Sequence, residues 1–528
     1  MSTDARAITG ATDEERHTPL RGSTISSAAS WLALGLGCLA LPFAYGIDNV
    51  PCAAWLAPLF LLRFVRTQRL WISMPVLLVA QMAATAFQLR GMFITDGSAY
   101  WIGLLVSVVP ILVPYAIDRA MIRRLPGLLG TFVFPVSYAI IDYIGSFGPY
   151  GSWGAVGYSQ YGELALLQLT ALTGLWGITF LIGWFAAVGN LIWEDGWKSA
   201  AALRTGAVFF VVLTLILIGG GLRLTAFAPR SPTVRIASLS ALPQGAPNAL
   251  DHLVAGKATA GDLAQIRAWA TSVDDDLLRR ADLAARNGAR IVFWAEGNAS
   301  VLKQDEGQLL TAGSQLAARD KIYLGMALAV WVPGAARVLE NELIMIEPTG
   351  AIAWHYRKSH PVPGAEEAIS APSDGKLRVL DTPFGRLSAA ICFDADFPQT
   401  LRQAGLLNTD IVLNPSNEWA AIDPWHTQMA SLRAIEEGTS VVHQASHGLS
   451  AAFDYQGNRL AAVDYFRSDG ASMIADVPTR GVRTLYSRLG DWFAWLCCVA
   501  LVALIITALG RRAPVAPSGR RSRGKTSQ

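Results

Sequence analysis

Three predicted strands in the second half of the chain end in side chains that together can perform nucleophilic catalysis: Glu296, Lys358 and Cys392. The reactive form of a cysteine is its thiolate, which is scarce at neutral pH because the thiol pKa is about 8.5. A carboxylate such as Glu296 can remove the thiol proton, and an ammonium such as Lys358 can stabilise both the thiolate and a tetrahedral oxyanion. The three residues therefore predict acyl transfer through a thioester.

Cys392 is the only one of the five cysteines that lies in the polar half of the chain, so no disulfide partner is expected in its domain. The others lie in or beside long apolar runs: Cys38, Cys52, Cys497 and Cys498. A lone cysteine is more often a buried structural side chain than a nucleophile, and a charged residue at a strand end is usually solvated. The joint occurrence with Glu296 and Lys358 favours catalysis.

The polar half, residues 232–485, alternates short β-rich runs with charged amphipathic segments, a pattern typical of a layered α/β domain. Strands are predicted at residues 233–240, 289–295, 321–330, 340–346, 352–357, 387–393, 411–414, 440–444 and 450–453. Helices are predicted at 262–287, 309–319, 398–405 and 427–437. Because Glu296, Lys358 and Cys392 stand at the ends of predicted strands, the edges of the sheets would position them.

The rest of the chain is far more apolar than a soluble protein. Of 528 residues, 52% are hydrophobic and 16% are charged, against about a quarter charged in a typical globular domain. Runs of about 20 apolar residues can span a bilayer as helices. We predict a seven-span domain at residues 28–228 and an eighth span at 489–510; the seven lie at about 28–46, 50–66, 70–90, 98–118, 126–147, 163–193 and 204–226.

Positive charges predict the orientation of these spans. Arginines follow the second span (Arg63, Arg66, Arg69) and the fourth (Arg119, Arg123, Arg124), and the tail at 511–528 is basic, whereas the loops after the first, third and fifth spans are nearly free of positive charge. Lys and Arg accumulate in cytoplasmic loops. We therefore expect both termini, including a polar segment at 1–27, in the cytoplasm and the polar domain on the periplasmic or exterior side. The net charge of +3 is too small to indicate a nucleic-acid partner.

In their chain order, Glu296, Lys358 and Cys392 resemble the catalytic triad of the nitrilase (carbon–nitrogen hydrolase) superfamily. Lys358-Ser-His-Pro-Val-Pro-Gly-Ala-Glu366 is similar to its lysine motif, and Arg433-Ala-Ile-Glu436, preceded by His426, is similar to one of its helix motifs. The resemblance implies an αββα sandwich and a supporting role for Glu366. It also implies supporting roles for the two residues after the nucleophile, Phe393 and Asp394.

The membrane half is similar to a narrower group. Gly157-Tyr-Ser-Gln160 and Leu172-Thr-Gly-Leu-Trp-Gly177 resemble the membrane region of apolipoprotein N-acyltransferases, which place a nitrilase-like domain between the seventh and eighth of eight spans. The chain departs from that family at residues 393–394 (Phe-Asp for Tyr-Glu), 420–423 (Ala-Ala-Ile-Asp for a Phe-Gly loop) and 443–448 (no Arg, no Asn-Thr-Gly turn). These loops line the acceptor side, so the acyl acceptor stays open.

The resemblance implies an enzyme of the cell (inner) membrane that moves an acyl chain from a phospholipid, through Cys392, to the N-terminal amine of an apolipoprotein. Weaker substrate contacts are expected at Tyr158, Trp176 and Trp419, and at the loop aromatics Tyr150 and Trp153; for all but Trp419 the alternative is an interfacial aromatic belt. No cofactor or metal is expected, since no Cys/His spacing indicates a zinc site. Two alternatives remain open: a membrane-tethered amidase or nitrilase that uses water, and a non-catalytic lipid-binding scaffold.

Overall fold

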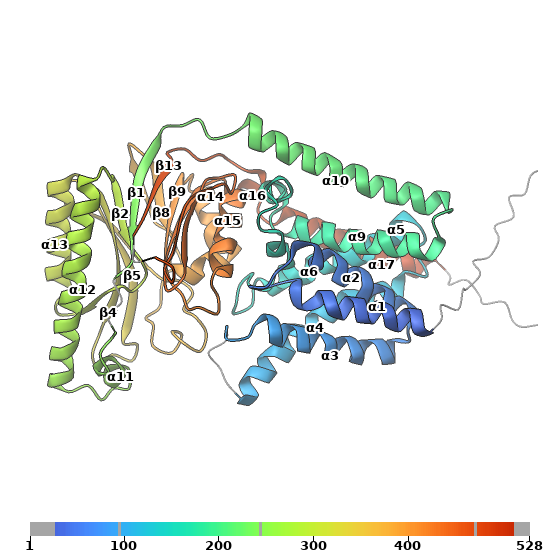
Figure 1. The fold of residues 1–528 in the computed structure, drawn as a ribbon, viewed down its shortest axis with the longest axis horizontal. Coiled ribbons are helices and arrows are strands. Elements are labelled where there is room, and N and C mark those ends of the chain that lie inside the picture. Colours follow the sequence, from blue (N-terminus) through green and yellow to red (C-terminus); the bar gives the residue numbers. More distant parts are fainter. Residues whose placement is uncertain (1–26, 93–96, 242–244, 469–471, 512–528) are drawn as a thin grey trace, which may run out of the picture.

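The computed structural model describes residues 27–92, 97–241, 245–468 and 472–511. The predicted N-terminal segment 1–27 and basic tail 511–528 lie outside the described residues, apart from their innermost positions. The described chain forms a helical half and a half built from two sheets, which lie side by side with the helices α14 and α15 between them (Figure 1).

The helical half contains a helix at each predicted span. Six helices or helix pairs among the described residues are long and apolar enough to cross a membrane: α3 (Leu70–Gln88), α4 (Gly97–Met121), α5 with α6 (Leu128–Thr131, Val133–Gly145), α9 (Trp176–Asp195), α10 (Ala200–Ala226) and α17 (Trp492–Gly510). The two other predicted spans coincide with shorter helices, α1 (Ser27–Ala40), extended by the 3-10 turn η1 (Leu41–Phe43), and α2 (Pro51–Thr67). The eight-span count stays a prediction.

The predicted sixth span, 163–193, is divided. Two single turns, α7 (Leu164–Leu167) and α8 (Thr170–Thr173), follow the 3-10 turn η2 (Val156–Gln160), and only α9 is a long helix. Gly174 ends α8 with a φ of +65°, and a Cβ there would lie 2.4 Å from the Tyr486 ring. A glycine is therefore required where the chain turns against α16 (Leu485–Leu489).

Arg63 and Arg66 lie inside α2 and not in the loop that was predicted to hold them. Arg66 donates Nε and Nη2 to the two carboxylate oxygens of Asp118 on α4 at 2.7 and 2.8 Å, and Arg63 donates Nη1 to Glu194 on α9 at 3.1 Å. Buried charges are tolerated when they are paired in this way. These pairs tie three helices together at the ends remote from the two sheets.

Two sheets form the other half, and they are stacked face to face. The first has the order β13-β1-β2-β4-β5-β6, with β3 paired to β4, and the second has the order β12-β11-β10-β9-β8-β7. The strands of the first sheet are β1 (Thr233–Leu239), β2 (Ile291–Trp294), β3 (Ala299–Leu302), β4 (Tyr323–Trp331), β5 (Leu339–Ile346), β6 (Ile352–Arg357) and β13 (Ser472–Pro478). Those of the second are β7 (Val379–Thr382), β8 (Gly385–Ala389), β9 (Ile411–Asn417), β10 (Ser440–Ser446), β11 (Leu449–Phe453) and β12 (Arg459–Asp464).

Helices cover both outer faces, which confirms the predicted αββα sandwich. On the first sheet lie α12 (Ala260–Arg286) and α13 (Glu306–Asp320), and near its edge lies the short α11 (Ala249–Val254); on the second sheet lie α14 (Pro398–Leu406) and α15 (Trp425–Glu437) (Figure 1). The start of α12 is fixed by a capping box, in which the Thr259 hydroxyl accepts from the Asp262 N–H and the Asp262 carboxylate accepts from the Thr259 N–H.

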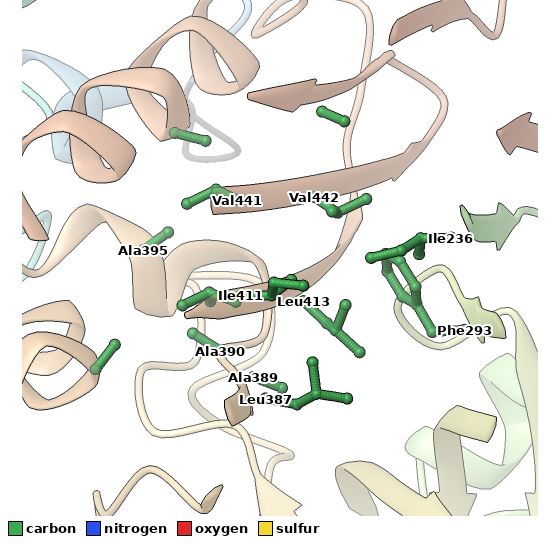
Figure 2. Close-up of a cluster of buried hydrophobic side chains, with 14 of the residues drawn as sticks. Ile236, Phe293, Leu387, Ala389, Ala390, Ala395, Ile411, Leu413, Val441 and Val442 are labelled. Atoms are coloured by element: carbon green, nitrogen blue, oxygen red, sulfur yellow. The ribbon is translucent and has the colours of Figure 1, made fainter. Parts of the chain in front are cut away.

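The core between the sheets consists of aliphatic and aromatic side chains. Ile236 and Phe293 of the first sheet face Leu413 and Val442 of the second (Figure 2), and all four are at most 1% exposed. Burying each such side chain contributes about 1.5–3 kcal/mol. The core therefore fixes the register of β2, which precedes Glu296, and of β9, which pairs with β8 before Cys392.

Buried polar contacts join the sandwich to the helical half. Arg433 of α15 donates to the Tyr158 hydroxyl of η2, and Gln168, directly after α7, donates Nε2 to the Gln456 carbonyl between β11 and β12 at 2.9 Å. Trp176 of α9 packs among α15 side chains in one buried cluster. Tyr158 and Trp176 are each 1% exposed. The two halves therefore share an ordered interface and are not merely linked by α10 and α17.

Two groups of elements differ from the sequence predictions. The strand predicted at 387–393 ends at Ala389 and is followed by the 3-10 turn η3 (Cys392–Asp396), because Cys392 has a φ of +48° that a strand cannot contain. The strands β3, β7, β12 and β13 were not predicted. They are four to seven residues long, and β7 and β12 lack a continuous apolar face, so their pairing partners decide their conformation.

Candidate active site

Cys392 lies at a sharp turn between β8 and α14. Its φ of +48° is unusual for a residue with a side chain and costs of order 1–3 kcal/mol, which the surrounding structure must offset. The Asp394 N–H donates to the Ile391 carbonyl at 3.0 Å, and Asp394 Oδ2 accepts from the Ile391 N–H at 3.1 Å. The turn directs the Cys392 side chain out of the line of β8 and toward Glu296 and Lys358.

Glu296 and Lys358 form a buried ion pair beside this turn. Lys358 Nζ donates to Glu296 Oε1 at 2.7 Å and to Glu366 Oε2 at 2.6 Å. Glu296 is 3% exposed and Lys358 is 2% exposed. Burial lowers the pKa of the Lys358 ammonium, but the adjacent Glu296 and Glu366 carboxylates outweigh burial and raise it well above its ordinary value. Lys358 is therefore a permanent cation, and one of its three N–H groups remains for a substrate oxygen.

Two asparagines hold Glu296, and neither was predicted from the sequence to have a role in the site. Asn341 of β5 donates Nδ2 to Glu296 Oε1 at 2.7 Å, and the Asn417 backbone N–H donates to Glu296 Oε2 at 2.9 Å. Asn341 belongs to no motif, and it stands between two glutamates in β5, so nothing in the sequence distinguishes it. Both carboxylate oxygens are thus oriented, and the same β9 terminus reaches the thiol, since Cys392 Sγ lies 3.9 Å from the Asn417 carbonyl oxygen.

The thiol of Cys392 is protonated at rest. Burial raises its pKa well above the ordinary value, the charge of Glu296 raises it further, and only Lys358 acts in the opposite direction. A protonated, buried thiol beside an oriented carboxylate requires that carboxylate to remove its proton as the thiol attacks. The geometry is thus that of a general base, a cation and a nucleophile.

Asp394 links the nucleophile turn to the lysine loop. Its Oδ1 accepts from the Ser359 and His360 backbone N–H groups at 2.9 and 2.7 Å, and its Oδ2 accepts from the Tyr356 hydroxyl at 2.6 Å. Burial raises the pKa of Asp394 to about 7, although the Tyr356 hydroxyl, the Lys358 charge and the backbone N–H groups all lower it. Asp394 therefore fixes the position of Cys392 relative to Lys358.

The thiol opens into an apolar pocket of about 550 Å³, including its open mouth, that both halves of the protein build. The lining residues are Met92, Tyr150, Trp153, Val362, Pro363, Cys392, Phe393, Trp419, Ile422 and His426. Trp419, Tyr150 and Trp153 therefore lie where substrate contacts were expected. Trp419 is held there because its indole N–H donates to the Gly91 carbonyl at 3.1 Å.

Tyr158 and Trp176 do not line this pocket, contrary to the expectation from sequence. Both side chains are buried against α15 in the interface between the two halves. The Tyr158 hydroxyl accepts from Arg433, and the Trp176 indole N–H donates to Asp491 at the start of α17. Glu366 lies at the lysine, as expected, and Phe393 lines the pocket and packs edge-on against Phe397 at 5.3 Å.

Among solved structures, an amidase from Nesterenkonia sp. resembles the chain with a TM-score of 0.37 and 18% identity over 48% of this chain and 92% of its own. The sandwich and its Glu–Lys–Cys site define the class: residues 241–485 match the family model described as carbon–nitrogen hydrolase.

The helical half narrows the class to one family. Residues 26–188 match the model described as apolipoprotein N-acyltransferase N-terminal domain. Curated relatives include an apolipoprotein N-acyltransferase of Gloeobacter violaceus, 32% identical over 32% of this chain and 30% of its own, and one of Geobacter metallireducens, 23% identical over 46% and 49%. The matches thus span about half or less of each relative. The chain thus combines an apolipoprotein N-acyltransferase N-terminal domain with a carbon–nitrogen hydrolase domain, and it is a multi-pass membrane protein.

Proposed function

We propose that the protein transfers an acyl chain from a membrane phospholipid, through a thioester on Cys392, to the α-amine of a diacylglyceryl-cysteine at the N-terminus of a lipoprotein. The observation that carries the proposal is the position of the thiol, which faces an apolar pocket shared by the catalytic sandwich and the membrane helices. An acyl chain is apolar and can pack against the apolar side chains that line this pocket. A lipid can reach the pocket from the bilayer without crossing water.

The first half-reaction forms the thioester. Glu296 takes the thiol proton as Cys392 Sγ attacks the ester carbonyl carbon of the phospholipid, and the oxyanion receives the free N–H of Lys358 Nζ. The C–O bond to the glycerol then breaks, and Glu296 returns its proton to the departing alkoxide. The products are a lysophospholipid and the acyl-enzyme.

The second half-reaction consumes the thioester. The neutral α-amine attacks the thioester carbonyl, Glu296 accepts a proton from the amine nitrogen, and collapse of the tetrahedral intermediate breaks the C–S bond. The proton passes from Glu296 to the sulfur, so the free thiol is restored and an amide is released. Because the donor product leaves before the acceptor reacts, the kinetics are expected to be ping-pong.

We further propose that the sandwich lies on the periplasmic side of the inner membrane, with both termini in the cytoplasm. The Tyr45 ring packs edge-on against Trp425 of α15 with ring centroids 4.7 Å apart, and Met92, Tyr150 and Trp153 line the pocket, so the loops after α1, α3 and α6 gather at the sandwich. These loops are poor in positive charge, whereas the arginines of α2 and α4 lie at the opposite ends of the helices. The charge bias therefore supports a catalytic domain outside the cytoplasm.

The test supplies detergent-purified full-length protein with a phospholipid labelled in its acyl chain and a synthetic diacylglyceryl lipopeptide with a free α-amine. N-acylated lipopeptide is the expected product, and Cys392→Ala should yield none. Release of labelled fatty acid at an unchanged rate whether or not the lipopeptide is present would instead identify a hydrolase. Absence of any acyl adduct on folded wild-type protein would refute the thioester.

A further inference from the structure

A cluster of two histidines and two carboxylates lies beside the pocket, and the proposed reaction does not use it. Glu418, directly after β9, lies at the centre: its Oε1 is 2.8 Å from His426 Nδ1 of α15 and 2.8 Å from His443 Nε2 of β10. The side chains of all three are at most 3% exposed. His426 also lines the pocket that contains Cys392.

Each histidine has an acceptor on its far side as well. His443 Nδ1 faces Asn414 Oδ1 at 2.6 Å. His426 Nε2 lies 3.3 Å from Asp396 Oδ2, an ion-pair distance at which neither atom makes a hydrogen bond among the described residues. The orientation of Asn414 is fixed, because its Nδ2 donates to the Ala390 carbonyl at 2.7 Å. All four ring nitrogens therefore face oxygen acceptors.

A neutral imidazole offers one donor and one acceptor, so two neutral rings cannot satisfy four acceptors. Two protonated rings would satisfy all four acceptors with their N–H groups, and a divalent cation among the three inner atoms satisfies them without the second proton on either ring. The cation accepts the lone pairs of His426 Nδ1, His443 Nε2 and Glu418 Oε1, and each ring keeps its single N–H for its outer oxygen. A histidine that binds a metal almost always donates its other N–H to a carboxylate or carbonyl, as Asp396 and Asn414 are placed to accept here.

A second observation concerns the free oxygen of Glu418. Oε2 is buried and has no hydrogen-bond partner among the described residues. A buried carboxylate oxygen without a donor is costly in a protein interior, whereas a cation bound at Oε1 neutralises the whole carboxylate. A Cβ at Gly448 would lie 2.3 Å from Oε2, so the glycine leaves room for this carboxylate.

We propose that Glu418, His426 and His443 form a binding site for one divalent transition-metal ion of the zinc class. Two imidazoles and one carboxylate suit Zn²⁺, whose bonds to nitrogen and oxygen are about 2.0–2.2 Å, so that tetrahedral ligand atoms lie about 3.3 Å apart. The two 2.8 Å contacts at Glu418 Oε1 need to open by about half an ångström. A water molecule would occupy the fourth coordination position of the ion.

The ion acts on the shape of the pocket and not on the bond-breaking steps. Its ligands come from three elements: the end of β9, the first turn of α15 and the middle of β10. Between Glu418 and His426 lie Trp419 and Ile422, both of which line the pocket. Binding therefore fastens the loop that carries these two side chains at both of its ends.

The experiment uses the full-length protein in detergent, treated with a chelator, then equilibrated with Zn²⁺ or, separately, with Co²⁺ and freed of unbound metal. We expect one equivalent of metal per chain by elemental analysis, a higher Tm with metal than without, and visible d–d absorption of the cobalt form. His443→Ala and Glu418→Gln should each abolish all three signals; two independent ligand variants are used because one of them can fail to fold.

His252→Ala is the matched control, because His252 forms an exposed histidine–carboxylate pair with Asp262 at 3.0 Å outside the cluster. It should retain one equivalent of metal. Wild-type protein that binds no stoichiometric metal, or that binds it equally well after His443→Ala and Glu418→Gln, would overturn the proposal. Stoichiometric Fe²⁺ bound in preference to Zn²⁺ would overturn the zinc assignment. None of these readouts depends on acyl transfer, so the site and the proposed function fail separately.

Discussion

The substitution Glu296→Gln isolates the step in which the thiol loses its proton. The replacement has nearly the same size, so packing around this 3% exposed side chain is preserved. It cannot act as a base, and it removes one of the two negative charges beside Lys358. The variant also loses one hydrogen bond. If the amide oxygen keeps the bonds from Lys358 and Asn341, the new NH₂ group takes the place of Oε2 and faces the Asn417 N–H, so two donors face each other.

The expected loss of rate follows from these contacts. Removing a general base costs about 10²–10⁴-fold, which corresponds to about 3–5.5 kcal/mol of barrier. A buried donor left facing another donor adds about 1–3 kcal/mol to the cost of the aligned state. We therefore expect acylation of Cys392 to fall by about 10⁴-fold.

The assay is single-turnover acylation by phospholipid, followed by intact mass spectrometry of the protein. Glu340→Gln is the matched control, because Glu340 is a carboxylate of the same domain that pairs with Lys303 and Arg357 at the surface. It should acylate at the wild-type rate. Glu366→Gln, which removes the more exposed partner of Lys358, should lose about 10–100-fold. A folded Glu296→Gln protein that acylates within tenfold of wild type would refute the role of Glu296 as the base.

Three further predictions concern the thiol, its turn and the interface. Because burial and Glu296 raise the pKa of Cys392, the rate of its alkylation by iodoacetamide in substrate-free protein should still rise with pH beyond pH 9; a plateau below pH 8 would mean a preformed thiolate. Asp394→Asn replaces a carboxylate that accepts four hydrogen bonds by an amide whose NH₂ group must face hydrogen-bond donors, so acylation of Cys392 should fall at least about 100-fold. An unchanged rate would show that Asp394 does not position Cys392. Tyr158→Phe removes a buried hydroxyl bonded to Arg433 and should lower stability by about 1–3 kcal/mol, measured as Tm, with KM for phospholipid unchanged. A raised KM with an unchanged Tm would instead show that Tyr158 contacts the substrate.

Local patterns are sufficient for much of this fold. The apolar runs predict helices, because a backbone in lipid must satisfy its hydrogen bonds within the segment, and each predicted span does contain a helix. The alternation in residues 232–485 predicts the layered domain. The strands that were missed, such as β7 and β12, are short and partly exposed, so they are strands only because a neighbouring strand pairs with them.

Some residues of the candidate site were predictable from sequence and others were not. Glu296, Lys358 and Cys392 were predicted together because all three stand at the ends of predicted strands, and the structure brings the first two to 2.7 Å. Asn341 and the Asn417 N–H were not found, since their role depends on the direction in which each points in space. Trp176 was misplaced because an aromatic side chain looks the same in sequence whether it faces lipid, a substrate or a carboxylate at the start of another helix.

The sequence by itself determined which chemical groups are available: one thiol in the polar half, a carboxylate and an ammonium at strand ends, and enough apolar length to span a membrane. The tertiary structure alone decided the left-handed turn at Cys392, the pocket shared with Met92 and Tyr150, and the grouping of Glu418, His426 and His443. The physical reason is the distance along the chain over which each kind of interaction acts. Hydropathy and strand alternation act between near neighbours in sequence, whereas a pocket, an ion pair or a ligand set needs side chains that only the packed chain brings together.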